Sequence, residues 1–240
     1  MTLPEPPPKW GQDEISKFFD VARGNEYATF ANFTGEIGRL IDIDLSYRKA
    51  IEGLNHSKEW FAGFFVLRAH SNFLAACRMG WSGQIPECHS MLRSCLESAL
   101  YGLYLACNPN SRETWLHRHD SVEYKKQIKN EFKIRTMLDL AKSLDGKEGK
   151  VAELLYERAI DHGAHPNERA LMQMLQINEK PIHVEFKTIY LEDDVEHLKL
   201  TMKTTAQTGV CALSLFRSIY KERYDILGVT AAIDHIKIGL

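Results

Sequence analysis

Arg158, His162 and His165 are the residues of this 240-residue sequence whose types and spacing most suggest chemistry. Arg158 follows Leu154 by four positions and Leu155 by three, which places it near the apolar face of an expected helix. His162 lies one turn further on. An arginine beside two histidines could clamp a phosphate group and move a proton near neutral pH, which is the chemistry of phosphoryl transfer.

His165 stands in an expected tight turn. Gly163 suits the end of a helix, and Pro166 biases the residue before it towards an extended backbone. A structural interpretation of the same residues is therefore open, in which histidine caps the helix and His165 donates to turn carbonyls. Residue types alone favour this structural interpretation over the catalytic one.

His89, Arg93 and Glu97 form a second constellation, spaced four apart and so stacked on one face of an expected helix. They could make a polar binding site inside a helical bundle, together with His162. They could also be structural, with an Arg93–Glu97 ion pair that fixes the register of the helix, and we favour this second interpretation because a charge in a core must be paired.

The sequence contains none of the usual cofactor or metal signatures: GxGxxG, GxxxxGK[ST], HExxH, GxSxG and an EF-hand loop are all missing. His162 and His165 could ligate a metal, but no Glu-x-x-His pair and no nearby acid completes a site. We predict no metal and no cofactor. A basic stretch over residues 125–135, with Arg118 before it, is interrupted by Glu123 and Glu131 and is typical of a solvated helix face.

Apolar periodicity predicts the elements that position these residues. We expect helices over residues 26–54, 57–79, 86–107, 150–162, 193–223 and 226–238, with two or three between 111 and 144 and a short one after 166. Residues 182–186 alternate as in a strand, and 189–191 could be its partner or its continuation. The prediction is all-α: a single multi-helix bundle of about eight helices with a small β excursion near residues 182–191. A Pro-rich tail over 1–11 precedes the domain, 12–240.

The composition is that of an ordinary globular protein, with 44% hydrophobic and 26% charged residues. A net charge of -2 removes the general argument for a nucleic-acid or membrane-surface protein. Five cysteines without a CxxC pair suggest a reducing compartment. The sequence has no signal-peptide pattern, and its longest strongly apolar run, residues 60–67, is too short to cross a bilayer. We therefore expect a cytoplasmic protein without membrane contact.

Two segments, residues 91–99 and 161–167, together resemble a bacterial all-helical family known only as a domain of unknown function. In that family an Arg-x-x-x-Glu helix, here Arg93 and Glu97, is followed some sixty or seventy residues later by a His-Pro turn, here His165 and Pro166. The resemblance covers about residues 57–221. It implies a helical fold and no activity.

That family is distantly similar to HEPN domains, whose motif is an arginine followed after four to six residues by a histidine. Arg158 and His165 match it with six residues between them. The resemblance implies an RNA-cleaving site at a dimer interface without metal, with His165 as acid and base and Arg158 on the scissile phosphate. Ala159 departs from the polar residue usual after the arginine, and the chain is longer than a minimal HEPN domain.

Two functions follow as expectations. The first is a non-catalytic helical interaction module that acts through protein contacts as an oligomer, in the simplest case a homodimer. The second is a metal-independent HEPN-like endoribonuclease of toxin or antiphage type, with RNA as a partner in that case alone. The enzyme requires Arg158 and His165 to converge, whereas the module predicts an acid beside Arg158 and turn carbonyls beside His165.

Overall fold

The computed structural model describes residues 5–54, 59–165, 168–180 and 184–240. Within these residues it has eleven α-helices, one π-helical turn and one two-stranded sheet, which confirms the predicted all-α fold with a small β excursion. The elements are α1 (Glu14–Asn32), α2 (Thr34–Glu52), α3 (Trp60–Ser82), α4 (Ile85–Cys107), α5 (Ser111–Leu116), α6 (Val122–Glu131), α7 (Ile134–Leu144), α8 (Gly146–Ala159), η1 (Ile160–Ala164), α9 (Glu168–Gln173), β1 (Leu175–Glu179), β2 (Val184–Thr188), α10 (Val195–Ile226) and α11 (Val229–Lys237). Residue 57, where the sequence places the start of α3, lies outside the described residues.

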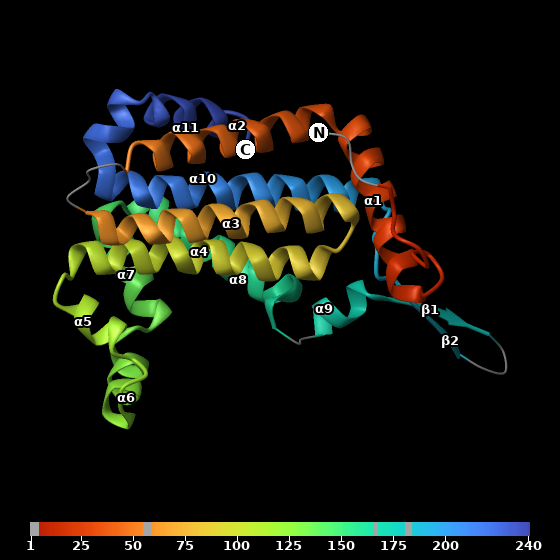
Figure 1. The fold of residues 1–240 in the computed structure, drawn as a ribbon, viewed down its shortest axis with the longest axis horizontal. Helices are drawn as coiled ribbons and strands as arrows, with labels where there is room; N and C mark the ends of the chain where they lie inside the picture. Colours follow the sequence, from red (N-terminus) through yellow and green to blue (C-terminus); the bar gives the residue numbers. More distant parts are fainter. Residues whose placement is uncertain (1–4, 55–58, 166–167, 181–183) are drawn as a thin grey trace.

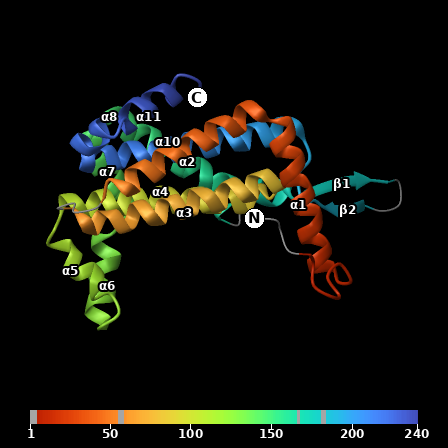
Figure 2. The same cartoon turned by 45° about the horizontal axis from the view of Figure 1, so that its top comes forward.

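Four long helices form the body of the molecule. α3 and α4 pack along their whole length, α10 lies against both of them and against α2, and all four follow the long axis (Figure 1). α11 covers α10 and α2 on one side, as the tilted view shows (Figure 2). The core between these helices includes Phe73, Leu96 and Phe216, all fully buried. Burial of such side chains is the main stabilisation of the bundle.

α3 is apolar nearly all round, yet only part of it is buried. Phe61 and Val66 face the core, whereas Trp60, Phe64 and Leu67 are exposed. No helix in the part of the chain that the structure describes combines the length and the apolarity needed to cross a membrane.

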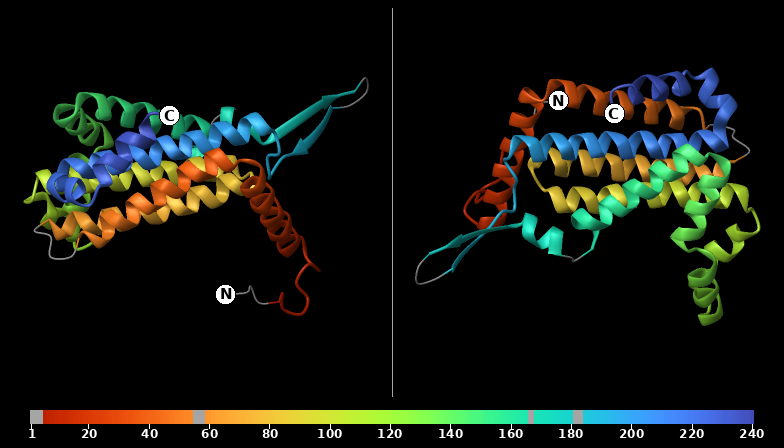
Figure 3. Two further views of the ribbon diagram at one scale, coloured as in Figure 1. Left: turned by 90° about the horizontal axis from the view of Figure 1, so that it is seen from above. Right: turned by 180° about the vertical axis from the view of Figure 1, so that it is seen from behind.

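The helix predicted over residues 26–54 is wrong in two respects: the helical part of the chain begins at Glu14, and it consists of two helices that meet at Phe33. The backbone of Phe33 leaves the helical region, at φ -115° and ψ 49°. Its N–H still donates to the carbonyl of Thr29 at 3.0 Å, and its own carbonyl accepts from the N–H of Ile37 at 2.9 Å. The chain therefore changes direction at Phe33 with only this residue between the two helices, and α1 diverges from the bundle (Figure 3).

β1 and β2 form an antiparallel hairpin that projects from the same end of the bundle as α1, while α5 and α6 lie at the opposite end (Figure 1). The predicted strand is confirmed from Val184 onwards, and residues 182 and 183 lie outside the described residues. Residues 189–191, expected as its partner or its continuation, are neither: β2 ends at Thr188 and pairs with Leu175–Glu179. Two backbone hydrogen bonds fix the base, from Ile189 to Met174 and from Glu192 to Gly83, both at 2.8 Å.

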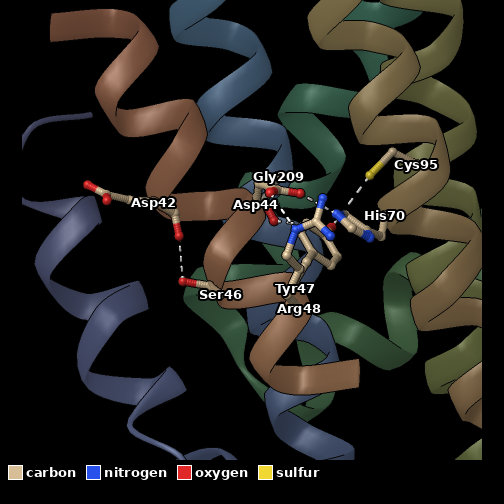
Figure 4. Close-up of polar contacts among 8 residues, drawn as sticks. All are labelled: Asp42, Asp44, Ser46, Tyr47, Arg48, His70, Cys95 and Gly209. Atoms are coloured by element: carbon tan, nitrogen blue, oxygen red, sulfur yellow. Dashed lines mark hydrogen bonds and ion pairs between the residues drawn. The ribbon is translucent and has the colours of Figure 1, made fainter. Parts of the chain in front are cut away.

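A polar cluster ties α2 to α3 and α10 (Figure 4). Asp44 contacts the Nε2 atom of His70 at 2.6 Å and accepts from the Nε atom of Arg48 at 2.7 Å. Tyr47 stacks on His70 with the ring centroids 5.0 Å apart and donates to the carbonyl of Gly209 at 3.4 Å. Although burial raises the pKa of Asp44, hydrogen bonds from Arg48 and His70 outweigh it and lower the pKa below its usual value. The cluster is accordingly a structural tie between helices.

Candidate functional site

A pocket of about 330 Å³ lies where the bundle meets the base of the hairpin. The beginnings of α4 and α10, the end of α8 with η1, and the residues around Met174 and Ile189 form its walls. Three of the residues predicted from the sequence line it: His89, Arg158 and His162. The structure therefore brings together side chains that lie about seventy positions apart in the sequence.

A π-helical turn is what allows His162 to meet His89. The helix predicted to run to His162 ends as α8 at Ala159 and continues as the wider turn η1. Gly163, inside this turn, has a φ of 156°, and a Cβ atom there would stand 2.4 Å from the carbonyl oxygen of Pro86. Because only a glycine permits this approach, η1 lies against the first turn of α4, and the rings of His89 and His162 stack at 5.2 Å.

His89 is a buried histidine held in its neutral form. Only 4% of the residue is exposed, and its Nδ1 atom has no hydrogen-bond partner among the described residues. Burial, with the neighbouring charges of His162 and Arg158, lowers the pKa of His89 to about 3. A buried nitrogen without a partner costs about 1 to 3 kcal/mol, so this atom is a mark of an incomplete site.

Arg158 is half-buried and lines the same pocket, and the hydrogen bonds of its Nη1 atom are to neutral side chains. Its Nη1 atom donates to the Oε1 atom of Gln207 at 3.0 Å and contacts the hydroxyl of Thr204 at 3.5 Å. Within the described part of the chain, no carboxylate forms an ion pair with it. The acid that a purely structural role would place beside Arg158 is thus replaced by a neutral amide.

Sequence reasoning missed other residues of the pocket, among them the polar pair Glu192 and His197. The Nδ1 atom of His197 lies 3.0 Å from Glu192, which raises the pKa of His197. Although burial raises the pKa of Glu192, the backbone N–H groups of Asp194 and Asp193 and the His197 ring lower it overall. The one available signal was the position of Asp194 as an N-cap, whose side chain accepts from the N–H of His197. An N-cap there places His197 in the first turn of a helix.

Arg93, Glu97 and His165 belong to a separate network between α4, α8 and η1. Arg93 donates to Glu97 at 2.8 Å, so the predicted ion pair is present, and it is partly exposed. Tyr156 donates to the same carboxylate at 3.1 Å, and the Arg93 guanidinium lies 5.4 Å from the centre of the Tyr156 ring. The Nη1 atom of Arg93 donates to the Nε2 atom of His165 at 2.8 Å. The ion pair thus links neighbouring elements as well as stabilising one helix.

Arg158 and His165 have different partners in the structure. Arg158 lines the pocket and holds Gln207, whereas His165 is exposed and accepts from Arg93, and it is not among the residues of the pocket. His165 has an extended backbone, as Pro166 predicted, at φ -136° and ψ 148°. The arginine beside His165 is accordingly Arg93 rather than Arg158.

A metal centre has no geometric support in the described residues, where no three His, Cys, Asp or Glu side chains come together as ligands. The polar groups of the pocket can instead bind a small molecule through hydrogen bonds and the positive charge of Arg158. That capacity is typical of a binding site rather than of an assembled catalytic pair.

The amphipathic hairpin is a second candidate surface. Directly opposed residues of an antiparallel pair point to the same side, and alternate residues to opposite sides. Since Ile177 opposes Phe186 and Leu175 opposes Thr188, one face of the hairpin carries Leu175, Ile177, Val184 and Phe186. Phe186 is 66% exposed and Val184 49%, so this apolar face is uncovered in the single chain.

Comparisons of the chain with protein-family models, with curated proteins and with solved structures gave no match. The resemblance to the helical family and to HEPN domains therefore stays a prediction.

Proposed function

We propose that the protein is a non-catalytic helical interaction module that assembles with a second copy of itself through the hairpin. The observation that carries the proposal is the uncovered apolar face of the hairpin. A two-stranded hairpin is only marginally stable in water and needs a further strand or a packed element. Here the hairpin projects from the bundle (Figure 3), so the cover must come from outside the chain.

A second copy supplies such a cover. α1 diverges at the same end of the molecule and exposes Ile15, Phe19 and Phe30, of which Ile15 is 69% exposed. Large apolar patches on a protein surface commonly mark interaction sites. Each copy offers both an apolar hairpin and an apolar helix, and the net charge of -2 opposes the association only weakly.

The proposal places the protein in a reducing compartment, the cytoplasm. Its five cysteines are free thiols, and Cys107 is the exposed one. An exposed free thiol at an oxidising site would form mixed disulfides, whereas the cytoplasmic thiol pool keeps it reduced. A protein partner other than a second copy would dock on the same hairpin face, and membrane contact plays no part in the proposal.

Sedimentation equilibrium of the wild type and of an Ile177→Ser/Phe186→Ser variant tests the assembly. We expect a wild-type dimer whose dissociation constant rises about thirtyfold or more in the variant, since a buried aromatic anchor contributes about 2 kcal/mol or more. Both side chains are exposed in the single chain, so the fold itself should be unaffected.

Val122→Ser on α6 is the matched control, because Val122 is 76% exposed and lies at the opposite end of the bundle. It should leave the dimer intact. A wild type that remains monomeric at every concentration, or a control that dissociates as readily as the hairpin variant, would contradict the proposal.

The non-catalytic part of the proposal has its own test, which is the incubation of the purified protein with a mixed RNA substrate in EDTA. Because Arg158 and His165 are held by Gln207 and Arg93, we expect no cleavage by the wild type or by His165→Ala. Cleavage by the wild type that is lost in a folded His165→Ala variant would instead identify the HEPN-like ribonuclease.

A further inference from the structure

The pocket at the base of the hairpin holds a positive charge that the chain does not neutralise there. Arg158 lines this pocket and a neighbouring one; among the described residues its Nη1 atom contacts Thr204, which lies in this pocket, and donates to Gln207, which lies in the neighbouring one. Two acids also line the pocket, Glu87 and Glu192. Glu192 is engaged by His197 and by the backbone N–H groups of Asp193 and Asp194, which all act on its carboxylate.

Glu87 is the other acid, and its position in the fold stabilises its negative charge. It stands in the first turn of α4, where the unpaired N–H groups of a helix favour a negative charge. Neither carboxylate forms an ion pair with Arg158. An anionic group in the pocket would therefore find its counter-charge at Arg158.

The neutral groups of the pocket favour an occupant that is polar at one end and apolar at the other. Thr201 and Thr204, on α10, are 3% and 2% exposed, and the Nδ1 atom of His89 lacks a partner among the described residues. Other walls are apolar and include Ile85 and Leu200. A volume of about 330 Å³ is within the range of small-molecule sites.

We propose that this pocket binds a small organic carboxylate, with the carboxylate on Arg158 and the apolar part of the molecule against Ile85 and Leu200. The planar guanidinium matches a carboxylate with two parallel N–H donors. His197, which also lines the pocket, is already paired with Glu192, so Arg158 is the group that we assign to the carboxylate. The inference does not depend on the oligomeric state of the protein.

Isothermal titration of the full chain with hexanoate and with benzoate tests the proposal, beside the neutral amides hexanamide and benzamide and inorganic phosphate. We expect saturable binding of a carboxylate and none of its amide. Arg158→Gln should weaken carboxylate binding about tenfold or more, whereas Arg135→Gln, which removes an exposed arginine of α7, should leave binding unchanged.

Leu200→Trp provides a second variant if Arg158→Gln does not fold, because Leu200 is 55% exposed and a larger side chain there fills the pocket while Arg158 stays in place. It should also weaken binding. Three results would overturn the proposal. They are no saturable binding of either carboxylate to the folded wild type, carboxylate binding by both variants that is as tight as that of the wild type, and binding of phosphate without binding of a carboxylate.

Discussion

A His89→Leu variant should keep about 2 kcal/mol of unfolding free energy that the wild type loses as the pH falls from about 7.5 to about 5. Burial and the charges of His162 and Arg158 lower the pKa of His89 to about 3 in the folded protein, against an ordinary value of 6.5. Between these two values the unfolded chain binds a proton that the folded chain excludes. Stability is therefore complete above pH 6.5 and is lost progressively as the pH falls towards 3.

Chemical denaturation at a series of pH values measures this difference directly. The matched control is His119→Leu, because His119 is an exposed histidine outside the pocket. It should retain the pH dependence of the wild type. Parallel pH profiles for the wild type and His89→Leu would show that His89 is protonated as easily in the folded protein as in the unfolded chain.

Gly163→Ala should destabilise the protein by about 2 to 5 kcal/mol and separate η1 from α4. A Cβ atom at Gly163 would stand 2.4 Å from the carbonyl oxygen of Pro86, and the positive φ of 156° adds backbone strain. Thermal or chemical unfolding measures the loss. In the same variant the His89 ring should move out of contact with His162 and titrate closer to pH 6.5, which nuclear magnetic resonance of the ring protons detects.

Two other glycines separate the causes of this effect. Gly228 has a φ of 70°, and apart from its chain neighbours no atom lies within 4 Å of where the methyl group of an alanine would stand. Gly228→Ala therefore carries the strain of the backbone without a clash. Gly146 has neither feature, and Gly146→Ala should change stability by less than about 1 kcal/mol. If Gly163→Ala is no worse than Gly228→Ala, the close contact between η1 and Pro86 has little energetic importance.

The long elements could be predicted from the sequence because their signals are local. The helix predicted over residues 193–223 corresponds to α10, which Asp194 caps: its side chain accepts from the N–H groups of Glu196 and His197. The alternation that identified β2 was also sufficient. Its partner escaped prediction because Leu175-Gln176-Ile177 is a short alternation that follows closely on α9, and short apolar patterns do not distinguish helix from strand.

Periodicity failed where one pattern spans two helices. Phe30, Ile37, Ile41 and Leu45 fit one face of a single helix, but the break at Phe33 changes the direction of the chain. Phe30, on α1, is 52% exposed. On α2 the buried face carries Ile37, Leu40, Ile43 and Tyr47, whereas Ile41 and Leu45 are 43% and 49% exposed. The residue at the break is neither glycine nor proline, so no local signal marked it.

The candidate site could be predicted only in part, because local patterns do not show which distant residues meet. Residue types identified His89, Arg158 and His162, but their meeting depends on a π-helical turn and on the contact of Gly163 with Pro86. Both are tertiary features. The pairing of His165 with Arg93, instead of Arg158, likewise depends on where η1 lies against α4.

Hydrogen–deuterium exchange of the wild type at low and at high protein concentration tests the central claim most directly, since it reports on the hairpin itself. Assembly through the hairpin predicts that the amides of β1 and β2, residues 175–179 and 184–188, exchange more slowly at high concentration, while those of α6, at the opposite end of the bundle, are unchanged. Hairpin amides that exchange equally fast at every concentration would contradict assembly through this surface.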